Sequence, residues 1–250
     1  MTTGASNTIV GGLAGDALTT GSDNVAIGAN ALSTEDTGGR NVAVGRGTLQ
    51  NQNVDSSAYN VAIGYEAGND ITTGVNNVIM GGLAGDALTT GAYNIAIGYQ
   101  ALSSEDTGSV SIGIGYYALQ AQNNASNNYN IAIGHSAGAA ITSGTQNTLI
   151  GGLAGTALTI GNSNVAMGMQ ALSTSVDGDY NTAIGYRALQ DYEDGDGNGH
   201  NTAVGGDSQL NASTGEFNTS LGSMSIGSGV TTGDYNIAIG YQAGAVLTSG

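Results

Sequence analysis

The segment Asn94-Ile95-Ala96-Ile97-Gly98 is one copy of a phrase that recurs along the whole chain and decides its fold. The closing glycine belongs to a column of fourteen, which are Gly11, Gly28, Gly45, Gly64, Gly81, Gly98, Gly115, Gly134, Gly151, Gly168, Gly185, Gly205, Gly222 and Gly240. Successive column glycines lie seventeen positions apart in most steps, and eighteen to twenty apart in the others. Spacing this regular is typical of repeat proteins, in which each unit stacks on the next.

The residue types within the phrase predict a β-strand. Isoleucine, valine, leucine or methionine stands one place before every column glycine, and valine, isoleucine or threonine stands three places before it. β-Branched side chains fit a pleated strand better than a helix. Asparagine stands four places before the glycine in thirteen copies, and Ser111 is the exception. Asparagines stacked in this way predict a ladder of side-chain amides.

Side chains of a strand alternate between two faces, and neither face of this phrase is charged. In residues 93–100 one face carries the tyrosines and branched aliphatics, and the other carries asparagine, alanine, glycine and glutamine. The sequence leaves open which face points into the coil. Because both faces are mostly apolar or small, we expect the chain to self-associate through one of them.

A longer period overlies the short one and spans four coils. Three column glycines, each seventy positions from the next, open the sequence Gly-Gly-Leu-Ala-Gly, namely Gly11, Gly81 and Gly151. Four coils therefore make one higher-order unit. In these coils a bulky residue replaces the usual alanine two places before the glycine, as Ile79 does. We expect the small residue after the column glycine, Gly82 in that coil, to make room for this bulk.

These patterns predict an all-β parallel β-solenoid of about fourteen coils of about 17 residues, forming a single repeat domain over residues 1–250. The 44 glycines would suggest disorder if they were scattered, but their periodic placement indicates order. The absence of proline suits a continuous hydrogen-bonded ladder. The chain has no cysteine, so the redox compartment stays open.

The net charge of −16 comes from nineteen acids against three arginines. Such a surface repels phosphate backbones, so we expect no nucleic-acid partner. No apolar run approaches the length needed to span a membrane, so we expect no membrane insertion by this segment. The first residues also lack the basic start and apolar stretch of a signal peptide.

The sequence offers no enzyme constellation, and we expect neither catalytic residues nor an organic cofactor. His135 and His200 each replace a variable residue of the repeat, which predicts exposed turn or ladder positions. Short Gly-x-Gly strings belong to the repeat rather than to a phosphate-binding loop.

One acidic turn offers a candidate calcium site. Asp194, Asp196 and Asn198, followed by Gly199, match the first half of a calcium-binding loop, in which alternating oxygen ligands surround a hard cation. The glutamate expected at the twelfth position is replaced by Gly205. A solvated acidic turn is therefore the alternative interpretation.

Threonine pairs suggest a further alternative, an ice-binding face. Thr19-Thr20, Thr72-Thr73 and Thr89-Thr90 recur at related positions, and Thr231-Thr232 forms a fourth pair. Against this interpretation, only some coils carry the pair and adjacent strand residues point to opposite faces.

The repeated phrase resembles a known family. Asn-x-Ala-Ile-Gly followed by alanine resembles the head repeats of trimeric autotransporter adhesins, the YadA-like family, and residues 181–189 also look like bacteriophage tail-fibre repeats. The resemblance covers essentially the whole chain. It implies a left-handed parallel β-roll, three chains side by side and an adhesive or fibre-shaft role, and it implies no catalytic residue. The family's repeats are shorter than the repeat of this chain, so the turns here are expected to be longer.

The leading functional prediction is a segment of a trimeric extracellular fibre, of adhesin or tail-fibre type, at a cell or virion surface. The weakly repetitive stretches 51–57, 121–128 and 191–200 are the expected contact loops for a cell-surface receptor or glycan, because they vary while the scaffold does not. One alternative is a filament subunit that polymerises end to end. The other is a calcium- or ice-binding solenoid.

Overall fold

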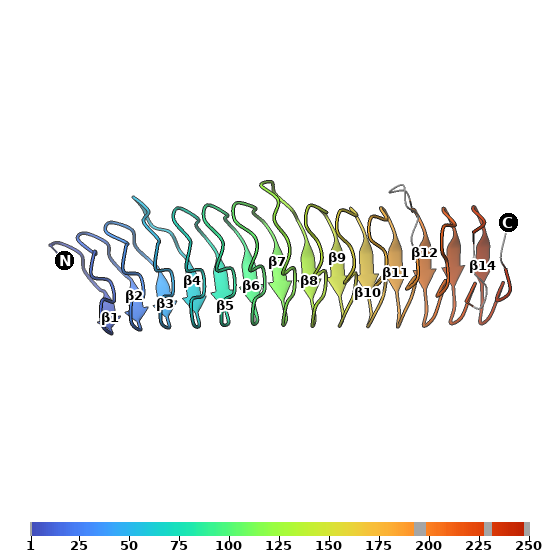
Figure 1. Ribbon diagram of the computed structural model, residues 1–250, viewed down its shortest axis with the longest axis horizontal. Helices are drawn as coiled ribbons and strands as arrows, with labels where there is room; N and C mark the ends of the chain where they lie inside the picture. Colours follow the sequence, from blue (N-terminus) through green and yellow to red (C-terminus); the bar gives the residue numbers. More distant parts are fainter. Residues whose placement is uncertain (1, 193–198, 228–231, 248–250) are drawn as a thin grey trace. The chain divides into compact units, whose positions relative to one another are not determined.

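The computed structural model describes residues 2–192, 199–227 and 232–247. The chain forms two compact units, Met1–Asn128 and Tyr129–Gly250, and each is considered by itself. Both units are built from the same kind of coil, in which one short strand is followed by a long turn (Figure 1).

Among its described residues, each unit contains seven short strands. In the first unit they are β1 (Thr8–Val10), β2 (Val25–Ile27), β3 (Val42–Val44), β4 (Val61–Ile63), β5 (Val78–Met80), β6 (Ile95–Ile97) and β7 (Ile112–Ile114). In the second unit they are β8 (Ile131–Ile133), β9 (Thr148–Ile150), β10 (Val165–Met167), β11 (Thr182–Ile184), β12 (Thr202–Val204), β13 (Thr219–Leu221) and β14 (Ile237–Ile239). Every strand lies directly before a column glycine, and the described residues contain no helix.

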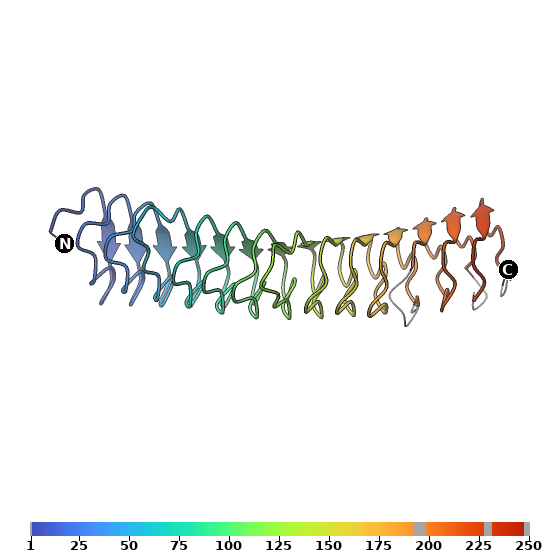
Figure 2. The same ribbon diagram turned by 90° about the horizontal axis from the view of Figure 1, so that it is seen from above.

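Successive strands within each unit pair in parallel and in register. Val25 of β2 pairs with Thr8 of β1 and with Val42 of β3, and Ala26 pairs with Ile9 and Ala43. The predicted all-β parallel solenoid is therefore confirmed within each unit. Figure 2 shows the strands β11–β14 along one side of their coils and the turns reaching to the other side. So short a strand is stable here because it bonds to the coils on both sides.

The structure identifies the inward face of the strands. The alanine column is fully buried, as at Ala26, Ala43 and Ala62, whereas the flanking Val25 and Ile27 are partly exposed. The face that carries asparagine and alanine therefore lines the interior, and the face that carries the branched aliphatics and tyrosines points outward.

Most coils add one large apolar side chain to this interior, from one of two positions. In some coils it stands four places after the column glycine, which gives Leu32, Leu49, Leu102, Leu119, Leu172, Leu189 and Ile226. In others it stands seven places after, which gives Leu18, Ile71, Leu88, Ile141 and Leu158. In the second group a glycine occupies the first position, so the two arrangements fill the same interior without overlap.

The prediction that the residue after the column glycine makes room for the bulky residue of the longer repeat was wrong. Gly82 does not make room for Ile79, because a Cβ atom on Gly82 would meet only the ring of Tyr99, at 3.6 Å. A Cβ atom on Gly85 would instead lie 2.9 Å from Leu88 and 3.3 Å from Ile79. The residue after the column glycine points outward, like the first and third residues of the strand. The space for the bulky side chain is therefore left by Gly85, three residues later, inside the coil.

The asparagine column forms the predicted ladder. The Oδ1 atom of Asn24 accepts a hydrogen bond of 3.0 Å from the backbone N–H of Asn41, and its Nδ2 donates to the carbonyl of Gly38 at 3.0 Å. At the exception, Gln122 donates to the hydroxyl of Ser111 at 2.9 Å, while the Ser111 N–H still bonds to Asn94. These buried side chains therefore satisfy backbone groups of the neighbouring coil.

Candidate interaction surface

The outward sides of the strands form an apolar surface on each unit, which we call the outward face. It consists of the first and third residues of each strand, and all of these are threonine, valine, isoleucine, leucine or methionine. The third residues are prominent because they remain 36–48% exposed at Ile27, Ile63, Met80, Ile133, Met167, Ile184 and Leu221. Contiguous exposed apolar surface of this kind marks interaction sites in soluble proteins.

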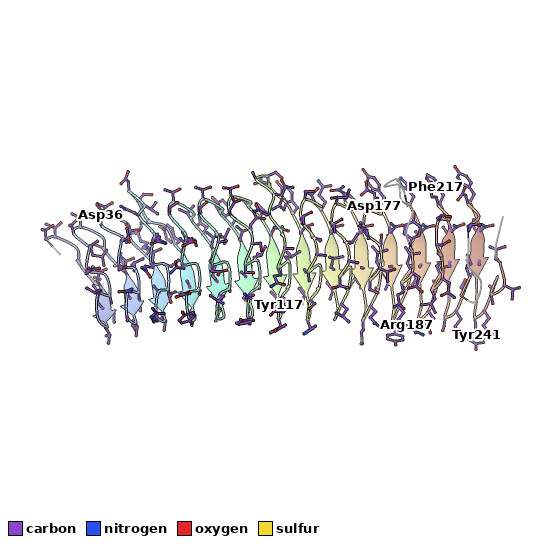
Figure 3. The ribbon with its side chains drawn as sticks, viewed as in Figure 1. Asp36, Tyr117, Asp177, Arg187, Phe217 and Tyr241 are labelled. Atoms are coloured by element: carbon purple, nitrogen blue, oxygen red, sulfur yellow. The ribbon has the colours of Figure 1, made fainter. Side chains whose placement is uncertain are left out.

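Aromatic side chains border the outward face at both ends of the strands. The entry rim is the column directly before the asparagines, and its exposed rings include Tyr59, Tyr93, Tyr129, Tyr180, Phe217 and Tyr235. The exit rim is the column directly after the column glycines, and its exposed rings are Tyr65, Tyr99, Tyr116, Tyr186 and Tyr241. In the second unit Phe217 and Tyr241 lie beyond opposite ends of the strands (Figure 3).

Rings on the entry rim stack along the second unit. His200 lies between Tyr180 and Phe217, with ring centroids 4.8 and 4.9 Å apart and planes within 8°. Phe217 continues the stack to Tyr235 at 5.1 Å. His200 thus belongs to the aromatic stack of the entry rim. The tyrosine column in the sequence was the signal for this stack, although it did not reveal that His200 joins it.

All three arginines lie over tyrosine rings of the rims, close to a carboxylate. Arg40 lies 5.5 Å from the ring centre of Tyr59, and Arg46 lies 5.5 Å from that of Tyr65. Arg187 contacts the Tyr186 ring at 4.9 Å and bonds to Asp207 at 2.8 Å, and this hydrogen bond raises the pKa of Arg187. Each positive charge is therefore matched locally, and the arginines do not gather into one basic patch.

Two buried glutamates close turns inside the first unit. Glu105 accepts hydrogen bonds from the N–H of Gly108 at 2.7 Å, from Gln122 at 2.9 Å and from Asn128 at 3.1 Å. Glu35 has the equivalent bonds to Gly38 and Gln52. Burial raises the pKa of Glu105. Because backbone and amide donors surround these carboxylates, their role is to hold turns, and the sequence pattern alone did not reveal it.

The candidate calcium ligands Asp194, Asp196 and Asn198 lie outside the described residues. Within the part of the chain that the structure describes, no group of three or more histidine, aspartate or glutamate side chains could hold a metal ion.

The threonine pairs bond between coils. The hydroxyl of Thr72 donates to the carbonyl of Thr89 at 3.2 Å, and the hydroxyl of Thr89 donates to the carbonyl of Asp106 at 3.0 Å. Thr19 bonds to Asp36 in the same way. One hydroxyl of each of these pairs therefore stabilises the stack, which gives these residues a structural reason to recur.

The expected contact loops 51–57 and 121–128 expose several side chains and are tied to the coil before them. Gly39 forms a parallel bridge with Ser57, and Ser109 forms one with Asn127. The third expected loop, 191–200, falls mostly outside the described residues.

Comparison with known proteins gives no family assignment. No protein-family model, no curated protein and no solved structure matches this chain. Among the described residues, no helix has the length and apolar character that crossing a bilayer requires.

Proposed function

We propose that this chain is a structural and adhesive segment of an extracellular fibre, assembled from three copies that meet through the outward face. The observation that carries the proposal is the outward face itself, an uncharged and largely apolar surface to which every described strand contributes within its unit. On this proposal the repeating element is a coil of about 17 residues. The coils wind left-handed, as in the adhesin and tail-fibre repeats that the sequence resembles.

The distribution of charge favours a second copy of the same chain as the occupant of the outward face. At a net charge of −16, two chains repel each other wherever their acids meet. The first and third strand residues carry no charge, so chains that meet there keep their acids in solvent. Association through this face therefore avoids most of the repulsion.

The size of the apolar surface supports the same occupant. In the first unit nine large side chains of the outward face and its rims remain exposed: Val10, Ile27, Tyr59, Ile63, Tyr65, Met80, Tyr93, Tyr99 and Tyr116. Covering each of them contributes about 0.5–1.5 kcal/mol, which gives roughly 5–13 kcal/mol for the unit. Association costs about 4–15 kcal/mol, so covering one unit already exceeds the lower part of that cost, and covering two such units, at roughly 10–26 kcal/mol, exceeds most of its range.

Three copies and a surface location follow from the resemblance to trimeric adhesin heads and tail fibres, and closed cyclic symmetry is the usual form of homo-oligomers. Loops 51–57 and 121–128 would then present varied side chains from a constant scaffold to a cell surface.

Light scattering coupled to size exclusion tests the assembly. The full chain should elute at three times its mass of 24.5 kDa. The double variant Ile63→Lys and Ile97→Lys should be a folded single chain, because two charges would be buried in the interface. Leu13→Lys is the matched control, since Leu13 is exposed but lies in a turn outside the outward face. A wild-type chain that stays monomeric at micromolar concentration, or equal dissociation by the control, would refute the proposal.

Electron microscopy separates this proposal from end-to-end polymerisation. Short rods of uniform length are expected for the three-chain segment. Open-ended filaments that lengthen with concentration would instead support a filament subunit.

A further inference from the structure

A polar hollow of about 220 Å³ lies on the first unit at the entry rim. Three successive turns line it, and its lining side chains include those of Ser22, Asp23, Thr37, Arg40, Ser56 and Ser57. The last two belong to the loop 51–57. Sites for drug-sized ligands are about 300–1,000 Å³, so this hollow suits a single small ring.

Arg40 and Asp23 place opposite charges side by side in the hollow. The Nη1 atom of Arg40 donates to the Ser57 hydroxyl at 2.7 Å and to the Tyr59 hydroxyl at 3.0 Å. Its Nε atom lies 3.8 Å from the Asp23 carboxylate, and both side chains keep about half of their surface exposed, 51% and 52%. The hollow therefore offers fixed donors, fixed acceptors and hydroxyls that can act as either.

This combination matches a neutral ring that carries several hydroxyl groups. Such hydroxyls donate to a carboxylate and accept from a guanidinium, and the serine and threonine hydroxyls of the hollow can pair with them in either direction. An anionic ligand is disfavoured, because Asp23 lies beside Arg40 and the whole chain carries a charge of −16.

The repeat supplies an internal comparison, which indicates that the backbone of the coil does not depend on the charged pair. One longer period further along the chain, Val110 stands in the position of Arg40, and Tyr93 stands in the position of Asp23. Val110 and Arg40 share the same backbone conformation, with φ of 61° in both. Because an apolar residue serves the scaffold equally well there, the Arg40–Asp23 pair needs a reason other than the fold.

We propose that this hollow binds a neutral saccharide ring, held by Arg40, Asp23 and the surrounding hydroxyls. The inference rests on the proposed adhesive function and gives it a ligand class. A single ring in a small open hollow supplies few contacts, so the expected dissociation constant is on the order of millimolar, equivalent to about 4 kcal/mol.

Saturation-transfer difference NMR on the full chain tests the proposal, with the methyl glycosides of glucose, galactose, mannose and N-acetylglucosamine as probes. At least one probe should show saturable transfer. Arg40→Gln and Asp23→Asn should each weaken its binding about tenfold or more, because each removes a hydrogen-bonding partner with a charge. Circular dichroism should show both variants folded, as Val110 and Tyr93 at the equivalent positions lead us to expect.

Arg46→Gln is the matched control. Arg46 also lies 5.5 Å over a tyrosine ring and 3.4 Å from a carboxylate, that of Glu66, but it is not among the residues that line the hollow. Sugar binding should therefore survive Arg46→Gln. No transfer to any probe at tens of millimolar, equal loss in Arg46→Gln, or binding of carboxylated sugars alone would overturn the proposal.

Light scattering on the same samples separates the two proposals. Three-chain assembly without sugar binding would overturn the saccharide site and leave the fibre intact. Sugar binding by a single chain would support the site and overturn the fibre.

Discussion

Removing one asparagine from the buried ladder should destabilise the stack by several kcal/mol. Asn147 is fully buried in the second unit, and its Nδ2 donates to the carbonyl of Gly161 at 2.8 Å. Its Oδ1 accepts from the backbone N–H of Asn164 at 3.0 Å. Asn147→Ala deprives both backbone groups of these bonds. At about 1–3 kcal/mol for each buried group left without a partner, the expected loss is roughly 2–6 kcal/mol.

Ser111, the natural exception in the asparagine column, leads to a second expected result. Ser111 is tolerated because Gln122, seven places after its column glycine, donates to the serine hydroxyl. The equivalent position after Asn147 is Leu158, which has no polar group. Asn147→Ser should therefore cost nearly as much as Asn147→Ala.

Denaturant unfolding and amide hydrogen exchange would measure the effect. The N–H of Asn164 should lose protection beyond the global change, because it loses its own acceptor. Gln146→Ala, at the exposed residue directly before, is the matched control and should change stability by less than about 1 kcal/mol. If the control costs as much as Asn147→Ala, the ladder does not carry the stability assigned to it.

Three further predictions concern the column glycines and the acids of the first unit. Gly151→Ala should lower the melting temperature sharply, because Gly151 has a φ of 136° and a Cβ atom there would lie 2.5 Å from the carbonyl oxygen of Gly168. Gly152→Ala is the control and should leave the melting temperature nearly unchanged, because a Cβ atom there would meet nothing within 4 Å. Burial, with repulsion from Asp70, raises the pKa of Asp86 above 3.8, so the stability of the protein should rise as the pH falls through that raised pKa. Melting temperatures measured over a pH series should show that Asp86→Asn abolishes this rise and has a higher melting temperature than the wild type at neutral pH. The pKa of Glu105 is also raised by burial, so Glu105→Gln should flatten the corresponding rise between neutral pH and 4.5, and an unchanged pH profile would contradict that assignment.

The parts of the fold that repeat could be predicted from the sequence. The columns fix strand type, parallel stacking and the asparagine ladder, because each depends on one residue type recurring in register. The choice of the inward face could not be made, since both faces lack charge. It depends on the width of the coil, which admits alanine at Ala26 or Ala96 and admits Ile79 only where Gly85 leaves space.

The candidate surface was predicted in composition but not in detail. The sequence placed the tyrosines and the aliphatics on one face, and it did not show that this face is the outer one. The contacts of Arg40 depend on turns from three coils, which no spacing within a single coil encodes. The hydrogen bond between Glu105 and Gln122 could not be predicted for the same reason, since the two residues belong to successive coils.

In a repeat of this kind, residues that differ from the common pattern for structural reasons can be distinguished from those that differ for functional reasons, because every coil serves as a reference for the others. Ser111 departs from the asparagine column, and a neighbouring side chain, Gln122, gives its hydroxyl a hydrogen-bond partner inside the coil. That departure is compensated, and it needs no role beyond the fold. Arg40 lies at an exposed position of the entry rim, and Val110 and Tyr180 stand at the equivalent positions of the longer repeat, so the coil does not require an arginine there. Departures that the fold neither requires nor repairs are where a binding function is expected, and Arg40 beside Asp23 meets that criterion.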